Sequence, residues 1–96
     1  MSRVMTRHPD PDKQGTRIDA AIYEATKSAI LRSLEEAGDE GVAFGDLSGE
    51  VERRSDPAIW KARSVGWYTT TVKLDLEARS LICRSGSPQR LFLVAS

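Results

Sequence analysis

The pattern of apolar and polar residues predicts one long amphipathic helix near the start of the chain, from about Ile18 to Ala37. Projected at 100° per residue, its apolar residues gather into one broad stripe. These residues are Ile18, Ile22, Ala25, Ala29, Ile30, Leu34 and Ala37. Thr16 followed three residues later by Asp19 is a typical helix start, and Gly38 is a typical stop. Leu31 lies outside the stripe, so it is exposed, covered by the N-terminal segment, or part of a dimer contact.

A second, shorter helix is predicted from Phe44 to about Arg54. Its apolar residues recur at helical spacing and form a buried face; they are Phe44, Leu47 and Val51. The dipeptide Val42-Ala43 in front of this helix is too short to stand alone, but it could add a minimal strand to a sheet. Pro57 ends the helix, because proline cannot continue the backbone hydrogen-bond pattern. In the connection that follows, Ile59-Trp60 is expected to pack onto the core.

The third predicted helix runs from about Gly66 to Ser80 and carries two apolar stripes. The first stripe is formed by Trp67, Thr71, Leu74, Ala78 and then Leu81. The second is formed by Tyr68, Val72 and Leu76. A helix with two apolar faces contacts two layers of structure, so both stripes are expected to be buried. Only the remaining face is then expected to meet solvent, and it holds Gly66, Thr69, Thr70, Lys73, Glu77 and Ser80.

Two apolar-rich strands are predicted after this helix, at residues 81–84 and 89–94, with the turn chemistry of residues 85–88 between them. The order of helix, helix, helix and hairpin is that of an α+β winged helix. It has a three-helix core, a C-terminal β-hairpin as the wing, and room for a minimal third strand near Val42. One such domain is expected over residues 16–96.

The N-terminal segment, residues 1–15, is expected to be a flexible arm. Pro9, Pro11 and Gly15 interrupt regular structure there, and nearly all the other residues are polar or charged. Such a segment buries little apolar surface, so we expect it to pack only when something binds it.

The segment that joins the third helix to the hairpin resembles the recognition helix and wing of winged helix-turn-helix transcription regulators. In those proteins a Leu-Glu-x-x-x-Leu-Ile-x-Arg stretch leads into the wing. The residues that match it here are Leu76, Glu77, Leu81, Ile82 and Arg84. Ser80 stands where a glycine is more usual. More closely, the chain resembles a group of short bacterial proteins of uncharacterised function, with which it shares a Gly-Trp-Tyr-Thr-Thr-Thr run at residues 66–71; this resemblance covers about residues 16–94.

The resemblance implies that the domain binds duplex DNA and acts as a transcription regulator. In such regulators the third helix enters the major groove and the wing contacts phosphates or the minor groove. Carried over to this chain, one face of the third helix would meet the groove, and backbone N–H groups at its start would hold a phosphate. The hairpin strands would hold the DNA backbone. The residues at these three places are Thr69, Thr70 and Lys73 on the helix, Ser64 at its start, and Arg84 and Arg90 on the strands.

Charge sets the expected strength of such binding. The chain carries 14 Lys and Arg and 14 Asp and Glu, so its formal net charge is zero. Residues 1–52 hold six of the cations and eleven of the acids, whereas residues 53–96 hold eight cations and three acids. The basic half contains the third helix and the wing, which fits one face turned toward an anion. Zero net charge nevertheless predicts weak DNA binding with a shallow dependence on salt.

The alternative function is that of a protein-interaction or dimerisation module without nucleic-acid activity. Trp60, Leu31 and the N-terminal arm would then carry the contact, with a homodimer as one form of it. Aromatic anchors are where binding energy concentrates in protein interfaces, which favours Trp60 for this role. The acidic first half of the chain would remain free for a basic partner.

An enzymatic function is not expected. The one histidine, His8, lies in the arm, and Cys83 sits in an apolar strand, where a buried and unreactive thiol is expected. Metal-ligand spacing and a glycine-rich phosphate loop are both missing from the sequence, so neither a metal nor a cofactor is expected. A single cysteine fits the reducing cytoplasm. No apolar run approaches the roughly 18 residues of a membrane span, so no membrane partner is expected.

Overall fold

The computed structural model describes residues 2–94 and contains three α-helices and two small antiparallel sheets. The helices are α1 (Ala20–Ala37), α2 (Phe44–Arg53) and α3 (Val65–Ala78). The strands are β1 (Arg3–Met5), β2 (Arg17–Asp19), β3 (Val42–Ala43), β4 (Ile82–Ser85) and β5 (Arg90–Leu93). Two short 3-10 segments, Gly38–Glu40 and Pro57–Trp60, follow α1 and α2. The predicted α+β fold of the winged-helix type is confirmed.

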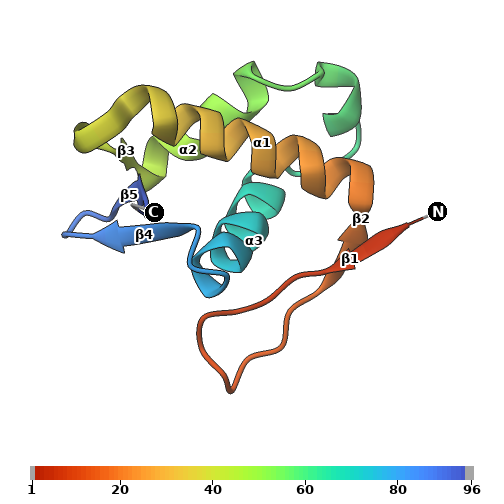
Figure 1. Ribbon diagram of the computed structural model, residues 1–96. Helices are drawn as coiled ribbons and strands as arrows, with labels where there is room; N and C mark the ends of the chain where they lie inside the picture. The colour runs from red at the N-terminus through yellow and green to blue at the C-terminus, as the bar shows by residue number, and fades with distance from the viewer. Residues whose placement is uncertain (1, 95–96) are drawn as a thin grey trace.

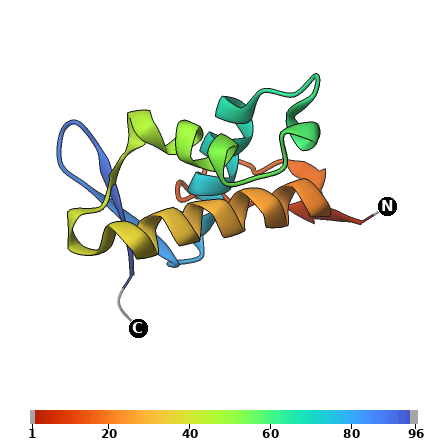
Figure 2. The same cartoon turned by 90° about the horizontal axis from the view of Figure 1, so that it is seen from above.

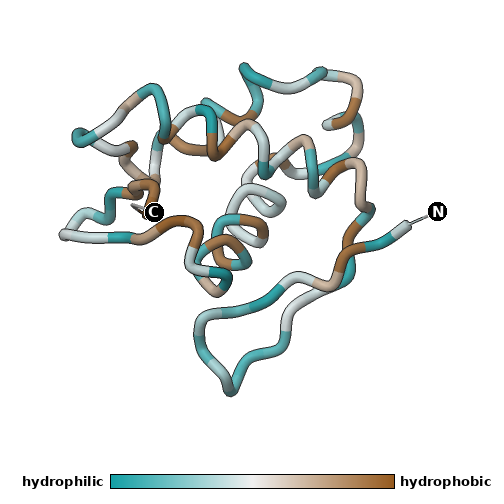
Figure 3. Tube along the Cα trace, in the orientation of Figure 1, coloured by the Kyte–Doolittle hydropathy of each residue, from teal (hydrophilic) through white to brown (hydrophobic). Residues whose placement is uncertain are grey.

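The core lies where the three helices meet the C-terminal sheet, and α1 crosses over α3 (Figure 1). Each helix contributes two fully buried aliphatic side chains, and β4 and β5 contribute one each. These residues are Ile30, Leu34, Leu47, Val51, Val72, Leu76, Ile82 and Leu91. Burying each of these side chains contributes roughly 1.5–3 kcal/mol to folding. Apolar segments recur along the helices and along the C-terminal strands (Figure 3). Among residues 2–94, no helix has the length and apolar character needed to cross a membrane.

The wing is a three-stranded sheet in the order β3-β5-β4. Val42 pairs with Leu91, and Leu91 also pairs with Arg84 on the other side, so β5 is the central strand. The minimal strand predicted at Val42-Ala43 is therefore confirmed. The sheet lies beside the C-terminal end of α1 (Figure 2).

Helix α1 begins two residues later than predicted. The Asp19 carboxylate accepts hydrogen bonds from the backbone N–H groups of Ala21 and Ile22, at 2.8 and 3.3 Å, and so caps the helix. Ile18 belongs to β2 instead of α1. The predicted stop at Gly38 is confirmed, since its backbone N–H donates to the Leu34 carbonyl in the C-cap position.

Residues 1–15, predicted to be a flexible arm, include a regular strand, β1. Strand β1 pairs with β2 in antiparallel register, with Val4 opposite Ile18. Val4 packs against the core and Ile18 is buried, so the apolar contact between them joins the N-terminal segment to the domain. A strand of three residues offers only one inward-facing side chain, too few to show a period of two in the sequence.

Beyond β1 the two sides of the arm stay in close contact at Thr6. The Thr6 backbone N–H donates to the Thr16 carbonyl at 2.9 Å, and the Thr16 N–H donates to the Thr6 hydroxyl at 2.9 Å. A Cβ atom at Gly15 would lie 1.6 Å from the Thr6 carbonyl oxygen. Only glycine permits this approach, so Gly15 keeps the arm closed instead of interrupting its structure.

Replacing Gly15 with alanine is therefore expected to open the arm and to destabilise the domain by about 1–3 kcal/mol. Amide hydrogen exchange at Thr6 and Thr16 should become faster. Gly45→Ala is the matched control, because Gly45 is an exposed residue of α2 with nothing within 4 Å of an added Cβ. That variant should be about 0.5–1 kcal/mol more stable than the wild type. Unchanged protection of Thr6 in Gly15→Ala would contradict this account of the arm.

Candidate functional site

Helix α3 has well-defined ends that fix the residues it presents. Ser64 is its N-cap, and the Ser64 hydroxyl accepts a hydrogen bond from the Trp67 backbone N–H at 3.1 Å. At the other end the Leu81 N–H donates to the Leu76 carbonyl at 2.9 Å, and the Ser80 N–H donates to the Glu77 carbonyl at 3.0 Å. This is the Schellman motif. One of the N–H groups predicted to hold a phosphate at the helix start is thus occupied by Ser64.

The face of α3 predicted to meet solvent is only partly exposed. Thr69 is 1% exposed and Lys73 is 3% exposed, and of the three residues expected to enter the DNA groove only Thr70 is exposed. The Lys73 amine lies 3.0 Å from the Glu77 carboxylate and 4.7 Å from the centre of the Phe44 ring. Lysine can bury its long apolar stem when the amine finds a carboxylate and an aromatic ring. The spacing of Lys73 and Glu77 is visible in the sequence, whereas the contact with Phe44 is not.

The first apolar stripe of α3, predicted to be buried, lies instead on the outer side of the helix. We call it the outer stripe: Trp67, Thr71, Leu74, Ala78 and Leu81. Trp67 is 48% exposed and Leu81 is 39% exposed, and the three residues between them are partly exposed. Val72 and Leu76 of the second stripe are the ones that enter the core. The prediction that both stripes are buried is therefore wrong for the outer stripe.

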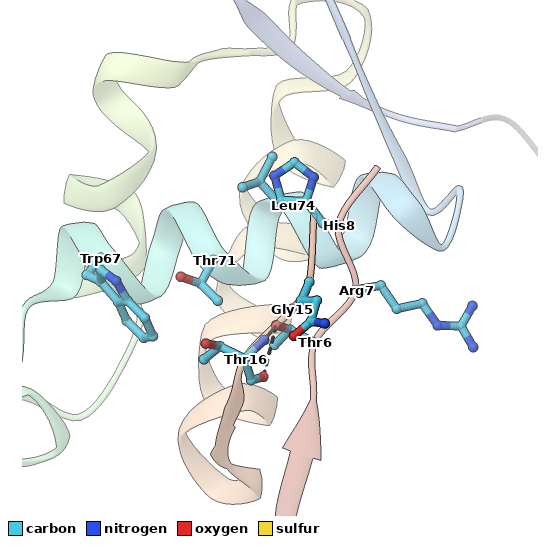
Figure 4. A pocket seen from close by; sticks show the side chains of 9 residues that line it. Thr6, Arg7, His8, Gly15, Thr16, Trp67, Thr71 and Leu74 are labelled. Carbon is cyan, nitrogen blue, oxygen red and sulfur yellow. Dashed lines mark hydrogen bonds between the residues drawn. The ribbon is translucent and has the colours of Figure 1, made fainter. Parts of the chain in front are cut away.

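The arm runs beside the outer stripe and forms a hollow of about 120 Å³ with it. Trp67, Thr71 and Leu74 line the helix side of this hollow. The arm side is formed by Thr6, Arg7, His8, Gln14, Gly15 and Thr16 (Figure 4). The outer stripe is thus bordered along one flank by a polar rim. Within that rim His8 stabilises a turn, since its Nδ1 accepts a hydrogen bond from the Asp10 N–H at 3.0 Å.

Asp75 fixes the arm against α3. Its carboxylate has no exposed surface and accepts hydrogen bonds from three parts of the chain. The donors are the Tyr23 hydroxyl at 2.5 Å, the Arg7 backbone N–H at 2.8 Å and the Arg79 Nε at 2.9 Å. Burial, together with the hydrogen bond to Asp75, raises the pKa of Tyr23 to about 12. The hydrogen bond to Asp75 also raises the pKa of Arg79.

The two arginines predicted to hold the DNA backbone are exposed but already engaged within the domain. Arg84 Nε lies 3.2 Å from the Glu77 carboxylate. Arg90 donates from Nε to the Glu40 carbonyl at 2.9 Å and from Nη2 to the Gly41 carbonyl at 3.3 Å. These contacts join the wing to α3 and to the segment after α1.

The two residues predicted to carry a protein contact are partly buried. The Trp60 indole N–H donates to the Ser55 hydroxyl at 2.8 Å, and its ring centre lies 5.8 Å from that of Tyr68. Leu31 and Trp60 both pack against the core. Cys83, predicted to be buried, is exposed. Only Ile82 of β4 points inward, which leaves the Cys83 side chain on the outer side of an edge strand.

Sequence reasoning did not identify a group of three arginines at the base of the arm. Arg3, Arg17 and Arg63 line a second hollow, of about 290 Å³, together with Ile18, Asp19 and Tyr68. Arg3 and Arg17 come from the paired strands β1 and β2, whereas Arg63 lies just before α3. Arg3 and Arg17 belong to residues 1–52, and the net negative charge of that half gives no indication of this local group of arginines.

Comparison with known protein families gives one match, over residues 3–91, to a family of unknown function described as DUF6958. The chain belongs to this family. The match begins at the first residue of β1 and includes all three helices, so the arm and the outer stripe of α3 both lie within the DUF6958 region. Neither the search of curated proteins nor that of solved structures finds a match.

The raised pKa of Tyr23 predicts a loss of stability at high pH. The unfolded chain releases this proton near pH 10 and the folded chain near pH 12, so between these values the folded state binds more protons. The free energy of unfolding should therefore fall by about 2–3 kcal/mol over this range, in addition to the change caused by other groups. Urea unfolding at several pH values should show this decrease in the wild type but not in Tyr23→Phe. Parallel pH curves for the two proteins would contradict it.

The end of α3 supplies a second stability test. Ser80 has a φ of +62°, a left-handed conformation that favours glycine. Ser80→Gly should therefore raise the free energy of unfolding by about 0.5–1 kcal/mol in urea titrations. Ala78→Gly, at the last residue of the helix, should lower it by up to about 1 kcal/mol. Destabilisation by both substitutions would show that the Ser80 side chain has a role beyond this conformation.

Proposed function

We propose that this domain is a non-enzymatic protein-interaction module whose contact surface is the outer stripe of α3. The observation that carries the proposal is the exposure of an apolar stripe, with a half-exposed Trp67 at one end and an exposed Leu81 at the other. A contiguous exposed apolar patch bordered by polar residues is typical of interaction sites. Trp67 has the size and position of an anchor residue, since tryptophan is enriched among the side chains that dominate binding energy.

The spacing of the outer stripe favours a helical partner. Within α3, from Trp67 to Ala78, the positions of the stripe advance by four, three and four residues, and Leu81 follows just past the end of the helix. These are the steps of the a and d positions of a heptad, along which a second helix can pack its own side chains. The polar arm beside the stripe would form the rim of such an interface.

Duplex DNA receives less support from the geometry. Thr69 and Lys73 are buried, while Arg84 and Arg90 are engaged by groups of the domain itself. An apolar outer stripe offers DNA neither phosphate contacts nor the polar side chains that read base edges. We place the protein in the cytoplasm, because the free thiol of Cys83 is exposed and would persist in a reducing compartment.

Site-specific photo-crosslinking inside cells tests the proposed surface. A photoreactive amino acid is placed at residue 67, and in a control protein at residue 28, where Ser28 is an exposed residue of α1. We expect residue 67 to give a discrete crosslinked protein that residue 28 does not give. The captured protein is then purified, and its binding to the wild type and to Trp67→Ala is measured by isothermal titration calorimetry. Removal of the anchor should weaken binding at least tenfold, about 1.4 kcal/mol.

Two results would overturn the proposal. One is the same set of crosslinks from residues 67 and 28. The other concerns duplex DNA, whose binding is measured by fluorescence anisotropy. The proposal fails if DNA binds the wild type at least as tightly as any captured protein does and if Trp67→Ala abolishes this binding. The second result would assign the outer stripe to nucleic acid.

A further inference from the structure

We propose that the hollow lined by Arg3, Arg17 and Arg63 binds carboxylates of an acidic protein segment. For the identity of the partner, this inference rests on the proposed function. The partner would place its apolar residues on the outer stripe of α3 and its acidic residues in this hollow. The anion site itself can be tested separately from the stripe.

The strand register brings the arginines together. In the pair β1–β2, Arg3 lies opposite Asp19 and Met5 lies opposite Arg17. Val4 and Ile18, which alternate with them, face the core. Side chains directly opposite each other in an antiparallel pair point to the same side, so Arg3 and Arg17 share the outer face of the arm.

Arg63 closes the hollow from the other side. It lies between the 3-10 segment Pro57–Trp60 and α3, and its Nη1 donates to the Ile59 carbonyl at 2.9 Å. This bond orients the guanidinium group and uses one of its five N–H donors. The donors that remain are available to a ligand in the hollow.

The hollow has an excess of positive charge. Its one carboxylate, Asp19, is already used as the cap of α1, where it accepts two backbone N–H groups. Within residues 2–94, none of the three arginines forms an ion pair with a carboxylate. By contrast, Arg54, Arg79 and Arg84 are each paired with an acidic residue of the domain. Three guanidinium groups around one solvent-filled hollow repel one another and attract an anion.

The neighbourhood of the hollow favours a protein carboxylate over a nucleic-acid phosphate. Tyr68 lines the arginine hollow and Trp67 lines the hollow beside the outer stripe. The two rings meet edge to face, with centres 4.9 Å apart, so the two hollows adjoin. An amphipathic segment with acidic residues at one end covers both surfaces at once. A phosphate backbone would satisfy the arginines but would leave Leu74 and the rest of the apolar stripe exposed.

The test uses a hexaglutamate peptide as the probe and a hexaglutamine peptide as the uncharged control. Binding is followed by NMR through the Arg side-chain Nε–Hε signals, at low ionic strength and at about 0.15 M salt, where surface charge interactions are more strongly screened. We expect saturable shifts of the Arg3, Arg17 and Arg63 signals with hexaglutamate only. Affinity should fall at least tenfold in the double variant Arg17→Gln/Arg63→Gln.

The matched control is Lys13→Gln/Arg32→Gln, which removes the same charge from two exposed residues outside the hollow. Its affinity for hexaglutamate should change less than twofold. Equal loss in the two double variants would overturn the proposal, because it would show attraction to overall charge. Hexaglutamate has no apolar side chain to place on the outer stripe, so this site and the proposed use of the outer stripe can fail independently.

A further arm of the experiment identifies the source of the anion. Inorganic phosphate and a random DNA duplex are titrated against the same proteins. Tighter binding of the duplex than of hexaglutamate, with the same dependence on Arg17 and Arg63, would overturn the carboxylate assignment in favour of nucleic acid. Weaker binding of both would support it.

Discussion

The buried carboxylate of Asp75 is the constraint on which the arrangement around α3 depends. A carboxylate without exposed surface is stable only when donors satisfy it, and here the donors come from α1, from the arm and from α3 itself. On the opposite side of the core-facing stripe, Lys73 forms an ion pair with Glu77 and lies over the Phe44 ring. These two buried charged residues flank Val72 and Leu76 and fix how the helix is turned about its axis. The side that remains, from Trp67 to Leu81, therefore faces outward.

Much of the fold could be predicted from the sequence because its signals are local. The stop of α1 at Gly38, the extent of α2, the minimal strand at Val42-Ala43 and the C-terminal hairpin all follow from caps, turn residues and short-range apolar spacing. Glycine is more usual at the position of Ser80 for a local reason as well, since this residue adopts a positive φ at the end of α3.

The candidate site could not be predicted in the same way, because it depends on contacts between distant parts of the chain. Two apolar stripes on α3 have the same period, so the pattern alone does not show which of them enters the core. The choice depends on Asp75, whose donor Tyr23 lies 52 residues away. The arginine hollow likewise combines the first strands with Arg63. The hollow therefore depends on the pairing of β1 with β2, which no local pattern in the sequence indicates.

The way in which Asp75 holds the arm has a consequence for how the rim of the site can vary. Its bond to the arm is made with the backbone N–H of Arg7, and the closure at Thr6 and Thr16 joins main-chain groups and the Thr6 hydroxyl. Neither contact uses the side chains of Arg7 and Gln14, which line the hollow beside the outer stripe. The arm thus keeps a fixed path while these two side chains can be exchanged. Proteins built on this frame can present different chemistry next to the same apolar stripe, much as an antibody changes its loops on a constant framework.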